Sequence, residues 1–195
     1  IMSLVSFGLV MAAELPETRR TGFVYLILTQ LGAGAIMSGL FLLSGGALLS
    51  DFSVIASAST QIQGLAVSVA LALLVFGFAG QAGLVPFHVS MPEAYGSAPA
   101  PAAALMSGAT LSLSVYGFLR VLLFLLPGVP AWFVFSVLVL GLSSAVVAVL
   151  LTVVGRDLKR ILAQDSTQVL GMIFTMIAIG LLASREGSPS LAQAA

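Results

Sequence analysis

The 195-residue sequence contains no cysteine, a single histidine and few charged residues. Without cysteine the chain can form no disulfide, no thiolate-ligated zinc site and no cysteine-ligated iron–sulfur cluster, and one histidine cannot build a multi-histidine metal site. Charged residues make up 7% of the chain, against about 25% in soluble domains. Seven basic and seven acidic residues cancel, which argues against a nucleic-acid partner.

Hydrophobic residues make up 59% of the chain, and its mean hydropathy is +1.17. A helix needs about 20 apolar residues to cross the roughly 30 Å hydrocarbon core of a bilayer. Five apolar runs are long enough, and one run at the start is too short. We therefore predict an all-α integral membrane protein, a polytopic bundle of one partial and five full transmembrane helices. The short run covers residues 1–13, and the full runs cover 22–49, 61–79, 101–126, 131–154 and 161–184.

The residues at both ends of the sequence indicate that it is part of a longer chain. The sequence begins at Ile1 inside an apolar run, and no basic residue precedes this run as it would in a signal peptide. It ends shortly after a Gly-Ser-Pro-Ser stretch that is typical of an interrupted polar loop. We expect residues 1–195 to form a partial transmembrane domain that is truncated at both ends.

Lysine and arginine are distributed unequally between the two sides of the predicted bundle. The side reached after the first, third and fifth runs holds five of them, and the opposite side holds only Arg120 and Arg185. Since cytoplasmic loops carry an excess of basic residues, we expect a multi-pass protein of the cytoplasmic (inner) membrane whose basic loops face the cytoplasm. These loops contain Arg19, Arg20, Arg156, Lys159 and Arg160.

A segment near the middle of the sequence combines helix-breaking residues with a polar side chain. Gly80, Gly83 and Pro86 follow one another at the end of an apolar run, with Gln81 between them. Proline removes a backbone donor and clashes with the preceding turn. The pattern fits a helix broken at membrane depth, as at the ion sites of transporters, and it also fits a plain helix end followed by a loop. We predict one discontinuous helix with its break between Gly80 and Pro86.

Small residues spaced four apart predict close contacts between helices. Such pairs are Gly34 with Ser38, Ala35 with Gly39, and Gly141 with Ala145. We interpret them as ordinary bundle packing, and they carry no information about transport.

Several motifs resemble one family of membrane proteins. The stretch GLVPFHVSMPEA (83–94), followed by ALMSG (104–108) and VYGFLR (115–120), resembles the antiporter-like membrane subunits of respiratory complex I. The greatest similarity is to the B-type membrane subunit of hydrogenase-4 and formate hydrogenlyase. Two further motifs of that family are matched by DLKRILA (157–163) with Ser166 and by RRTGFVYL (19–26) with Thr29. The resemblance covers essentially the whole chain in collinear order.

The resemblance implies a longer subunit with two inverted helical repeats, each containing one broken helix. It implies that protons or Na⁺ move along buried lysine, glutamate and histidine side chains, driven by electron transfer in neighbouring subunits. The partners would be the other membrane and peripheral subunits of a respiratory or hydrogenase complex. Quinone, iron–sulfur or nickel–iron centres would lie in those partners, and this chain would hold no cofactor.

The sequence departs from the family at the positions that would hold protons. The family usually has a lysine where this chain has Gln81, and commonly a second lysine where it has Ser112. Glutamine and serine hydrogen-bond water but cannot store a proton near neutral pH. The family's acidic partner would lie just before Ile1. An aromatic residue and a histidine are replaced by Gln164 and Asp165.

The candidate proton path therefore consists of Gln81, Ser112, His88 and Glu93. Histidine can take up and release a proton near neutral pH, but His88 also fits a loop histidine bonded to a backbone carbonyl. Glu93 is either a relay group or a carboxylate near the positive end of a helix dipole. Because Gln81 and Ser112 cannot titrate, the repeat that contains them either conducts protons through a row of water molecules or conducts no protons.

A second motif places Asp157, Lys159 and Arg160 in a predicted cytoplasmic loop. A solvated basic loop explains these residues, and contact with a neighbouring subunit is the alternative. Asp165 follows in the last helix, either as an anion of its first turn or as a relay group.

The sequence thus predicts a proton- or cation-translocating membrane subunit of a complex I-like NADH:quinone oxidoreductase or of an energy-converting nickel–iron hydrogenase. One alternative is a non-conducting structural subunit with a degenerate relay. Another is a subunit of an independent cation/proton antiporter. In each case the chain itself carries no redox centre.

Overall fold

The computed structural model describes residues 7–8, 16–46, 55, 65–125 and 129–185. These residues form helices and no strand, and five helical segments are long and apolar enough to cross a membrane. The helices are α2 (Pro16–Leu43), α4 (Leu65–Ala82), α5 (Ser90–Ser97), α6 (Ala100–Leu105), α7 (Leu111–Leu125), α8 (Ala131–Val154) and α9 (Leu158–Arg185). A 3₁₀ turn, Phe87–Val89, precedes α5, and a π-helical segment, Met106–Thr110, joins α6 to α7.

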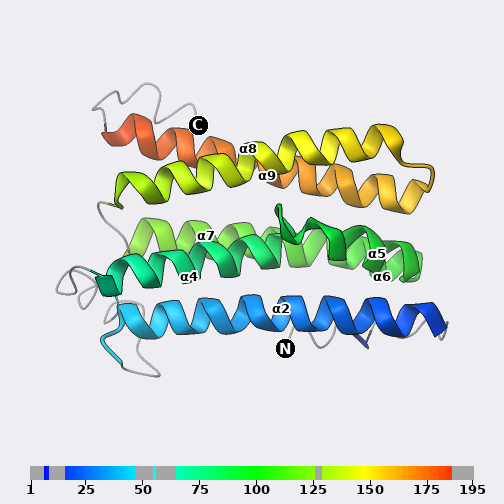
Figure 1. Cartoon of the computed structure of the whole chain (residues 1–195), viewed down its shortest axis with the longest axis horizontal. Coiled ribbons are helices and arrows are strands. Elements are labelled where there is room, and N and C mark those ends of the chain that lie inside the picture. Colours follow the sequence, from blue (N-terminus) through cyan, green and yellow to red (C-terminus); the bar gives the residue numbers. More distant parts are fainter. Residues whose placement is uncertain (1–6, 9–15, 47–54, 56–64, 126–128, 186–195) are drawn as a thin grey trace.

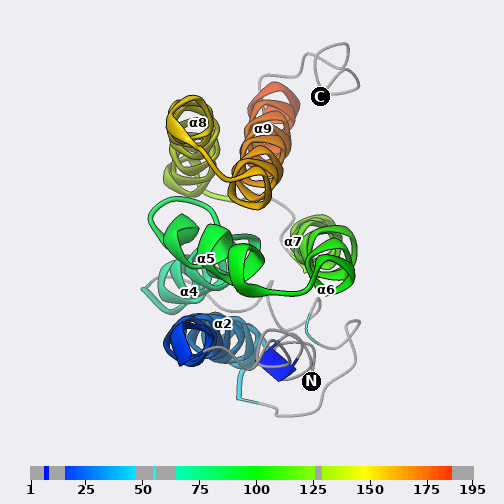
Figure 2. The same cartoon turned by 90° about the vertical axis from the view of Figure 1, so that its right-hand side faces the viewer.

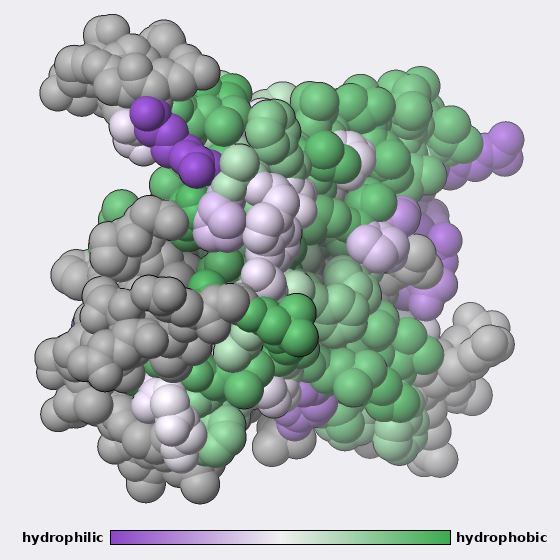
Figure 3. Space-filling view, turned by 60° about the vertical axis from the view of Figure 1, so that its left-hand side comes forward, coloured by the Kyte–Doolittle hydropathy of each residue, from purple (hydrophilic) through white to green (hydrophobic). Residues whose placement is uncertain are grey.

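The helices run roughly side by side in three layers (Figures 1 and 2). Helix α2 forms one outer layer and the α8–α9 hairpin forms the other. Between them lie α4 with α5 and α6 with α7, and α5 contacts both α2 and α9. Apolar side chains cover most of the face seen in Figure 3, and hydrophilic residues gather mainly towards its ends. This distribution suits a bundle surrounded by lipid.

One end of the bundle collects the start of α2, the α5–α6 connection and the α8–α9 connection (Figure 1). These are the segments that the sequence predicted to share one side. Helix α9 ends at Arg185 at the opposite end. The unequal distribution of basic residues along the chain is therefore also an unequal distribution between the two ends of the bundle.

Helix boundaries agree with the sequence prediction for α8 and differ for α2, α4 and α9, of which α4 covers residues 65–82 rather than 61–79. Helix α2 begins at Pro16 and ends at Leu43, earlier than the predicted run 22–49 at both ends. Helix α9 begins at Leu158 rather than at residue 161. Lys159 and Arg160 consequently lie in the first helical turn and not in a loop. The hydropathy pattern did not predict the charged first turns of α2 and α9, because a helix can extend beyond its apolar stretch.

Glycines bring neighbouring helices into backbone contact at two crossings. A Cβ on Gly77 of α4 would lie 2.7 Å from the carbonyl oxygen of Gly32 on α2. A Cβ on Gly171 of α9 would lie 2.7 Å from the carbonyl oxygen of Gly141 on α8. The prediction of a close contact at Gly141 is confirmed, whereas a Cβ placed on Gly34 has no atom of the described residues within 4 Å.

Candidate functional site: a helix break beside two polar pockets

The predicted discontinuity lies where α4 ends, midway along the bundle (Figure 1). Helix α4 ends at Ala82. The next residue, Gly83, has a φ of +66°, a backbone conformation that residues with a Cβ rarely adopt. The Gly83 N–H donates to the Gly80 carbonyl over 3.4 Å, and the Leu84 N–H donates to the Ala79 carbonyl over 2.9 Å. This pair of bonds is the Schellman arrangement that closes a helix C-terminus.

The break between Gly80 and Pro86 is therefore confirmed, with one correction. Gly80 itself is helical and buried inside α4, so it does not form the break. Gly83 ends the helix, and Pro86, preceded by a cis peptide bond, lies in the turn that follows. The chain then resumes in the same direction as α5, so the two short helices together complete one crossing (Figure 1).

A serine on a neighbouring helix binds the backbone that the break exposes. The Val85 N–H donates to Ser144 Oγ over 2.9 Å, and Ser144 Oγ donates to the Leu140 carbonyl over 2.5 Å within α8. Ser144 is completely buried. A backbone donor left unpaired in hydrocarbon costs several kcal/mol, so this bond stabilises the break. The sequence analysis missed Ser144, because a serine in an apolar helix gives no sign of the residue it binds.

Gln81 packs against helix α2 and lines neither of the two polar pockets described below. Its Nε2 donates to the Thr29 carbonyl of α2 over 3.0 Å, and its Cγ lies 3.5 Å from a Cβ placed on Gly32. The side chain therefore ties the last turn of α4 to α2. Gln81 is thus separate from the other predicted path residues, since it lines neither of the two pockets described next.

The first pocket, of about 370 Å³, combines residues of the two family motifs. His88 and Glu93, which follow the break, line it together with Arg160 and Gln164 of α9. His88 Nδ1 and Gln164 Oε1 are buried and have no hydrogen-bond partner among the described residues. The expectation that a backbone carbonyl satisfies His88 therefore fails at Nδ1. Buried polar atoms of this kind are the usual partners of ordered water.

The basic motif holds the end of α5. Lys159 Nζ donates to the Ala98 carbonyl, just beyond the last residue of α5, over 2.9 Å. A cation at this position compensates the negative end of the helix dipole. Arg160 Nε would lie 3.6 Å from a Cβ placed on Gly96 of α5, and the same side chain pairs with Asp157 over 3.6 Å at the surface. Neither sequence interpretation, a solvated loop or a contact with another subunit, included this contact within the chain.

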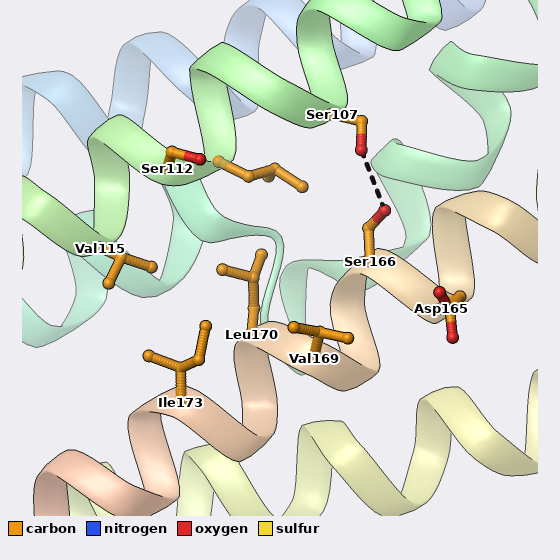
Figure 4. A pocket seen from close by; sticks show the side chains of 9 residues that line it. Ser107, Ser112, Val115, Asp165, Ser166, Val169, Leu170 and Ile173 are labelled. Carbon is orange, nitrogen blue, oxygen red and sulfur yellow. Dashed lines mark hydrogen bonds between the residues drawn. The ribbon is translucent and has the colours of Figure 1, made fainter.

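The second pocket is a groove of about 360 Å³ between α7 and α9. Ser107 of the π-helical segment and Ser166 of α9 face one another there, with their Oγ atoms 3.2 Å apart (Figure 4). Ser112 and Asp165 also line this groove. Asp165 lies about two turns inside α9, so the prediction of an anion in the first turn is wrong. Ser112 Oγ donates to the Gly108 carbonyl over 2.6 Å.

Two tyrosines in the interior were also missed by the sequence analysis. Tyr25 of α2 and Tyr95 of α5 are 1% and 3% exposed. Tyr95 Oη is buried without a well-formed hydrogen bond, and the side chains of Tyr25 and Ser107 lie near it. The predicted site residues thus fall into three places: Gln81 at the α2–α4 contact, His88 and Glu93 in the first pocket, and Ser112 and Asp165 in the groove.

Comparison with known proteins identifies the family of this chain. The transmembrane family described as NADH:quinone oxidoreductase/Mrp antiporter matches residues 1–188. The chain belongs to this family. The resemblance seen in the motifs is therefore confirmed, and the chain is a multi-pass membrane protein of the antiporter-like fold.

Curated relatives support the same family, and a solved structure shares the fold. The chain is 36% identical over 189 residues to an uncharacterised protein of Mycobacterium tuberculosis, covering 96% of this chain and 29% of that protein. It is 32% identical to hydrogenase-4 component B of Escherichia coli, covering 98% and 28%. In the archaeal membrane-bound sulfane sulfur reductase, one chain aligns with a TM-score of 0.81 at 24% identity, covering 90% and 36%. The chain thus spans about 29% of the length of these curated relatives.

Proposed function

We propose that this chain is part of a proton-translocating, antiporter-like membrane subunit of a complex I-like or energy-converting hydrogenase complex. Electron transfer would take place in partner subunits that hold the redox centres. The observation that carries the proposal is the helix break beside a pocket in which His88 Nδ1 and Gln164 Oε1 are buried without a hydrogen-bond partner among the described residues. Irregular backbone at membrane depth is tolerated where it is buried in protein or lines a wet cavity.

The first pocket suits the entry of protons from one end of the bundle. It is lined by Gly155 of the α8–α9 connection and by Arg160 in the first turn of α9. It also contains the only histidine of the chain, on the segment that follows the break. Water bonded to Gln164 would reach His88, which would pass protons towards the interior.

Substitutions of His88 in the full-length subunit, within its intact complex in membrane vesicles, test this function. His88→Asn keeps a hydrogen-bonding atom near the position of Nδ1 but cannot titrate, and His88→Phe removes both properties. We expect both variants to lose at least tenfold in proton uptake per electron transferred, with electron transfer retained. Normal uptake in His88→Asn would show that His88 only orders water. Electron transfer without any proton uptake by the wild-type complex would overturn the proposed function.

A non-conducting structural subunit is the second candidate, and one observation favours it. Gln81, at the position where the family carries lysine, is engaged by the Thr29 carbonyl. A side chain that cannot titrate and is held by backbone fits a helix contact better than a proton relay. Under this candidate, no variant of His88 changes proton uptake, and losses arise only from failed assembly.

We also propose that the end of the bundle holding the α8–α9 connection faces the cytoplasm, because the basic residues concentrate there. Residues 1–195 contain no cysteine, so Thr18→Cys and Arg156→Cys, in a protein from which any cysteine outside these residues has been removed, each introduce a single reactive thiol. Both should react with a membrane-impermeant maleimide in inverted vesicles and not in intact cells. Reaction only in intact cells would reverse the orientation.

A further inference from the structure

The α7–α9 groove contains a carboxylate that the described residues do not pair. Asp165 is exposed and makes no hydrogen bond or ion pair with any residue that the structure describes. It is also the only lining residue of the groove that titrates. The other lining residues are Ser107, Leu111, Ser112, Val115, Ser166, Val169, Leu170 and Ile173.

Asp165 lies inside the apolar part of the bundle and not at its aqueous end. Leu158 and Leu162 of α9 lie nearer to that end and are 72% and 57% exposed. Val154 of α8, close to the same end, is 77% exposed. Apolar surface at Leu162 therefore separates Asp165 from the exposed charged residues at that end, which are Asp157, Lys159 and Arg160. An ionised carboxylate in such a region is costly, and ionisable groups within membrane spans usually face a protein interior or a wet cavity.

Hydroxyl groups connect the groove to the interior of the bundle. Ser166 and Ser107 form a hydrogen bond in which either oxygen can donate, with a distance of 3.2 Å. Tyr95 Oη, buried and without a well-formed hydrogen bond, lies near Ser107 and Tyr25. These side chains come from α2, α5, the π-helical segment and α9, so the row of hydroxyls crosses the bundle from α2 to α9.

We propose that the Asp165 carboxyl is a proton-binding site, loaded from the bundle interior through the hydroxyls of Tyr95, Ser107 and Ser166. Ser166 would give its hydroxyl proton to Asp165 through water in the groove, and the Ser107 hydroxyl would replace that proton. The Tyr95 hydroxyl would replace the proton lost by Ser107, and Tyr95 would take up a proton from the bundle interior, so that every O–H bond broken along the row is formed again. The site deepens the proposed function and rests on it. It would supply the titratable group that Gln81 and Ser112 lack.

Asp165 is the only charged residue of the described elements that lines the groove. Helix α8 contains no ionisable side chain. The titratable or charged residues of the elements around α9, and those of α9 itself, lie outside the groove lining. They are His88 in the turn before α5, Glu93 and Tyr95 on α5, Tyr116 and Arg120 on α7, and Lys159, Arg160 and Arg185 on α9.

Carbodiimide labelling of the full-length subunit in its membrane complex tests the site directly. Carbodiimides modify carboxyl groups in their protonated form, and peptide mapping by mass spectrometry locates the modified residue. We expect Asp165 to be modified, and its modification to fall at least tenfold from mildly acidic to mildly alkaline pH. Asp157, which is exposed and paired with Arg160, is the internal comparison and should remain unmodified.

Two results would overturn the site. Absence of Asp165 modification at every pH would show a permanently ionised carboxylate, for example one paired with a residue beyond those described. Protection of Asp165 by Na⁺ at constant pH would show that Na⁺, and not the proton, is bound. Because labelling is measured on the wild-type protein without electron transfer, a failure of the proposed function leaves this measurement interpretable.

Substitutions separate a proton site from a structural one. Asp165→Asn should reduce proton uptake per electron at least tenfold, and Asp165→Glu should restore most of it. Ser107→Ala should reduce uptake less, because water can replace one hydroxyl. Ser143→Ala, on α8 and outside the groove, is the matched control. Normal uptake in Asp165→Asn would overturn the proposal even if His88 variants still abolish uptake.

Discussion

The α8–α9 hairpin and the central layer of the bundle differ in the regularity of their backbones. Helices α8 and α9 continue without interruption over 24 and 28 residues. In the central layer, the α4–α5 crossing is broken after Ala82, and the α6–α7 crossing contains a π-helical segment at Met106–Thr110. Both polar pockets lie where an irregular crossing meets the regular hairpin.

This difference shows how an irregular backbone persists in an apolar surrounding. The regular hairpin contributes side chains where the central layer lacks backbone partners. Ser144 of α8 binds the Val85 N–H, and Lys159 of α9 binds the Ala98 carbonyl at the end of α5. π-Helical turns and broken helices are frequent at functional sites. We interpret the hairpin as a scaffold that keeps the central layer in its irregular conformation.

The largest expected effect comes from breaking the scaffold itself. A Cβ on Gly171 would lie 2.6 Å from the Ala145 backbone nitrogen, and backbone atoms cannot move aside without separating the helices. Gly171→Ala should lower the free energy of unfolding by about 1–3 kcal/mol or more, seen as a lower thermal midpoint of the purified protein. Gly34→Ala, where no atom of the residues described by the structure lies within 4 Å of the new Cβ, is the control. Equal stability of the two variants would contradict the packing of α8 against α9.

Removing the link between the scaffold and the break should have the next largest effect. Ser144→Ala leaves the Val85 N–H without its partner, which costs about 1–3 kcal/mol. Ser143→Ala is a matched control, because within the part of the chain that the structure describes Ser143 Oγ bonds only to the Leu140 carbonyl of its own helix. Thermal unfolding of the two variants in the same detergent measures the difference. If they unfold at the same temperature, Ser144 does not support the break.

A substitution at the break itself should cost somewhat less. Gly83→Ala places a Cβ on a residue with φ of +66°, a conformation that costs about 1–2 kcal/mol for residues other than glycine. Gly80→Ala is the matched control three residues earlier, where the nearest atom lies 3.9 Å from the new Cβ and the backbone is helical. Gly80→Ala should be neutral or stabilising, by up to about 1 kcal/mol. A greater loss in Gly80→Ala than in Gly83→Ala would place the break elsewhere.

Features that depend on the local sequence, such as apolar runs and helix-breaking residues, could be predicted from the sequence. Apolar runs gave the membrane helices, and α8 matches its predicted bounds because its run ends sharply at Pro130 and Gly155. The break was predictable because glycine and proline act on the local backbone. The start of α9 was misplaced because Lys159, which binds the end of α5, has no apolar character to mark it as helical.

The candidate site was harder to predict, because its parts meet only through packing. Motifs far apart in the sequence bring His88 and Arg160 to one pocket, and the family resemblance selected both residues without indicating that they meet. The contacts of Gln81 with Thr29 and of Ser107 with Ser166 depend on how the helices are rotated about their axes. Hydropathy in a chain this apolar does not fix those rotations, since nearly every face of every helix is hydrophobic.

The smallest expected effect concerns the residue at the family's lysine position. Gln81→Ala removes one neutral hydrogen bond to the Thr29 carbonyl, which contributes about 0.5–1.5 kcal/mol. The Thr29 carbonyl lies within α2 and keeps its helical partner, so no buried group is orphaned. We expect proton uptake in vesicles, normalised to assembled complex, to stay nearly unchanged, since glutamine cannot carry a proton. Loss of uptake with normal assembly and electron transfer would mean that Gln81 orders an essential row of waters.

Gln81→Lys sharpens the same question, because it restores the family residue. A buried ammonium without a partner costs several kcal/mol, so the variant either acquires a carboxylate partner or loses stability. If Asp165 already supplies the titratable group, the added lysine should not raise proton uptake above that of the wild-type complex. In the Asp165→Asn background, the lysine would add a new titratable group at the end of α4. Recovery of uptake in that double variant alone would show that the proton site has moved from the helix break to the α7–α9 groove.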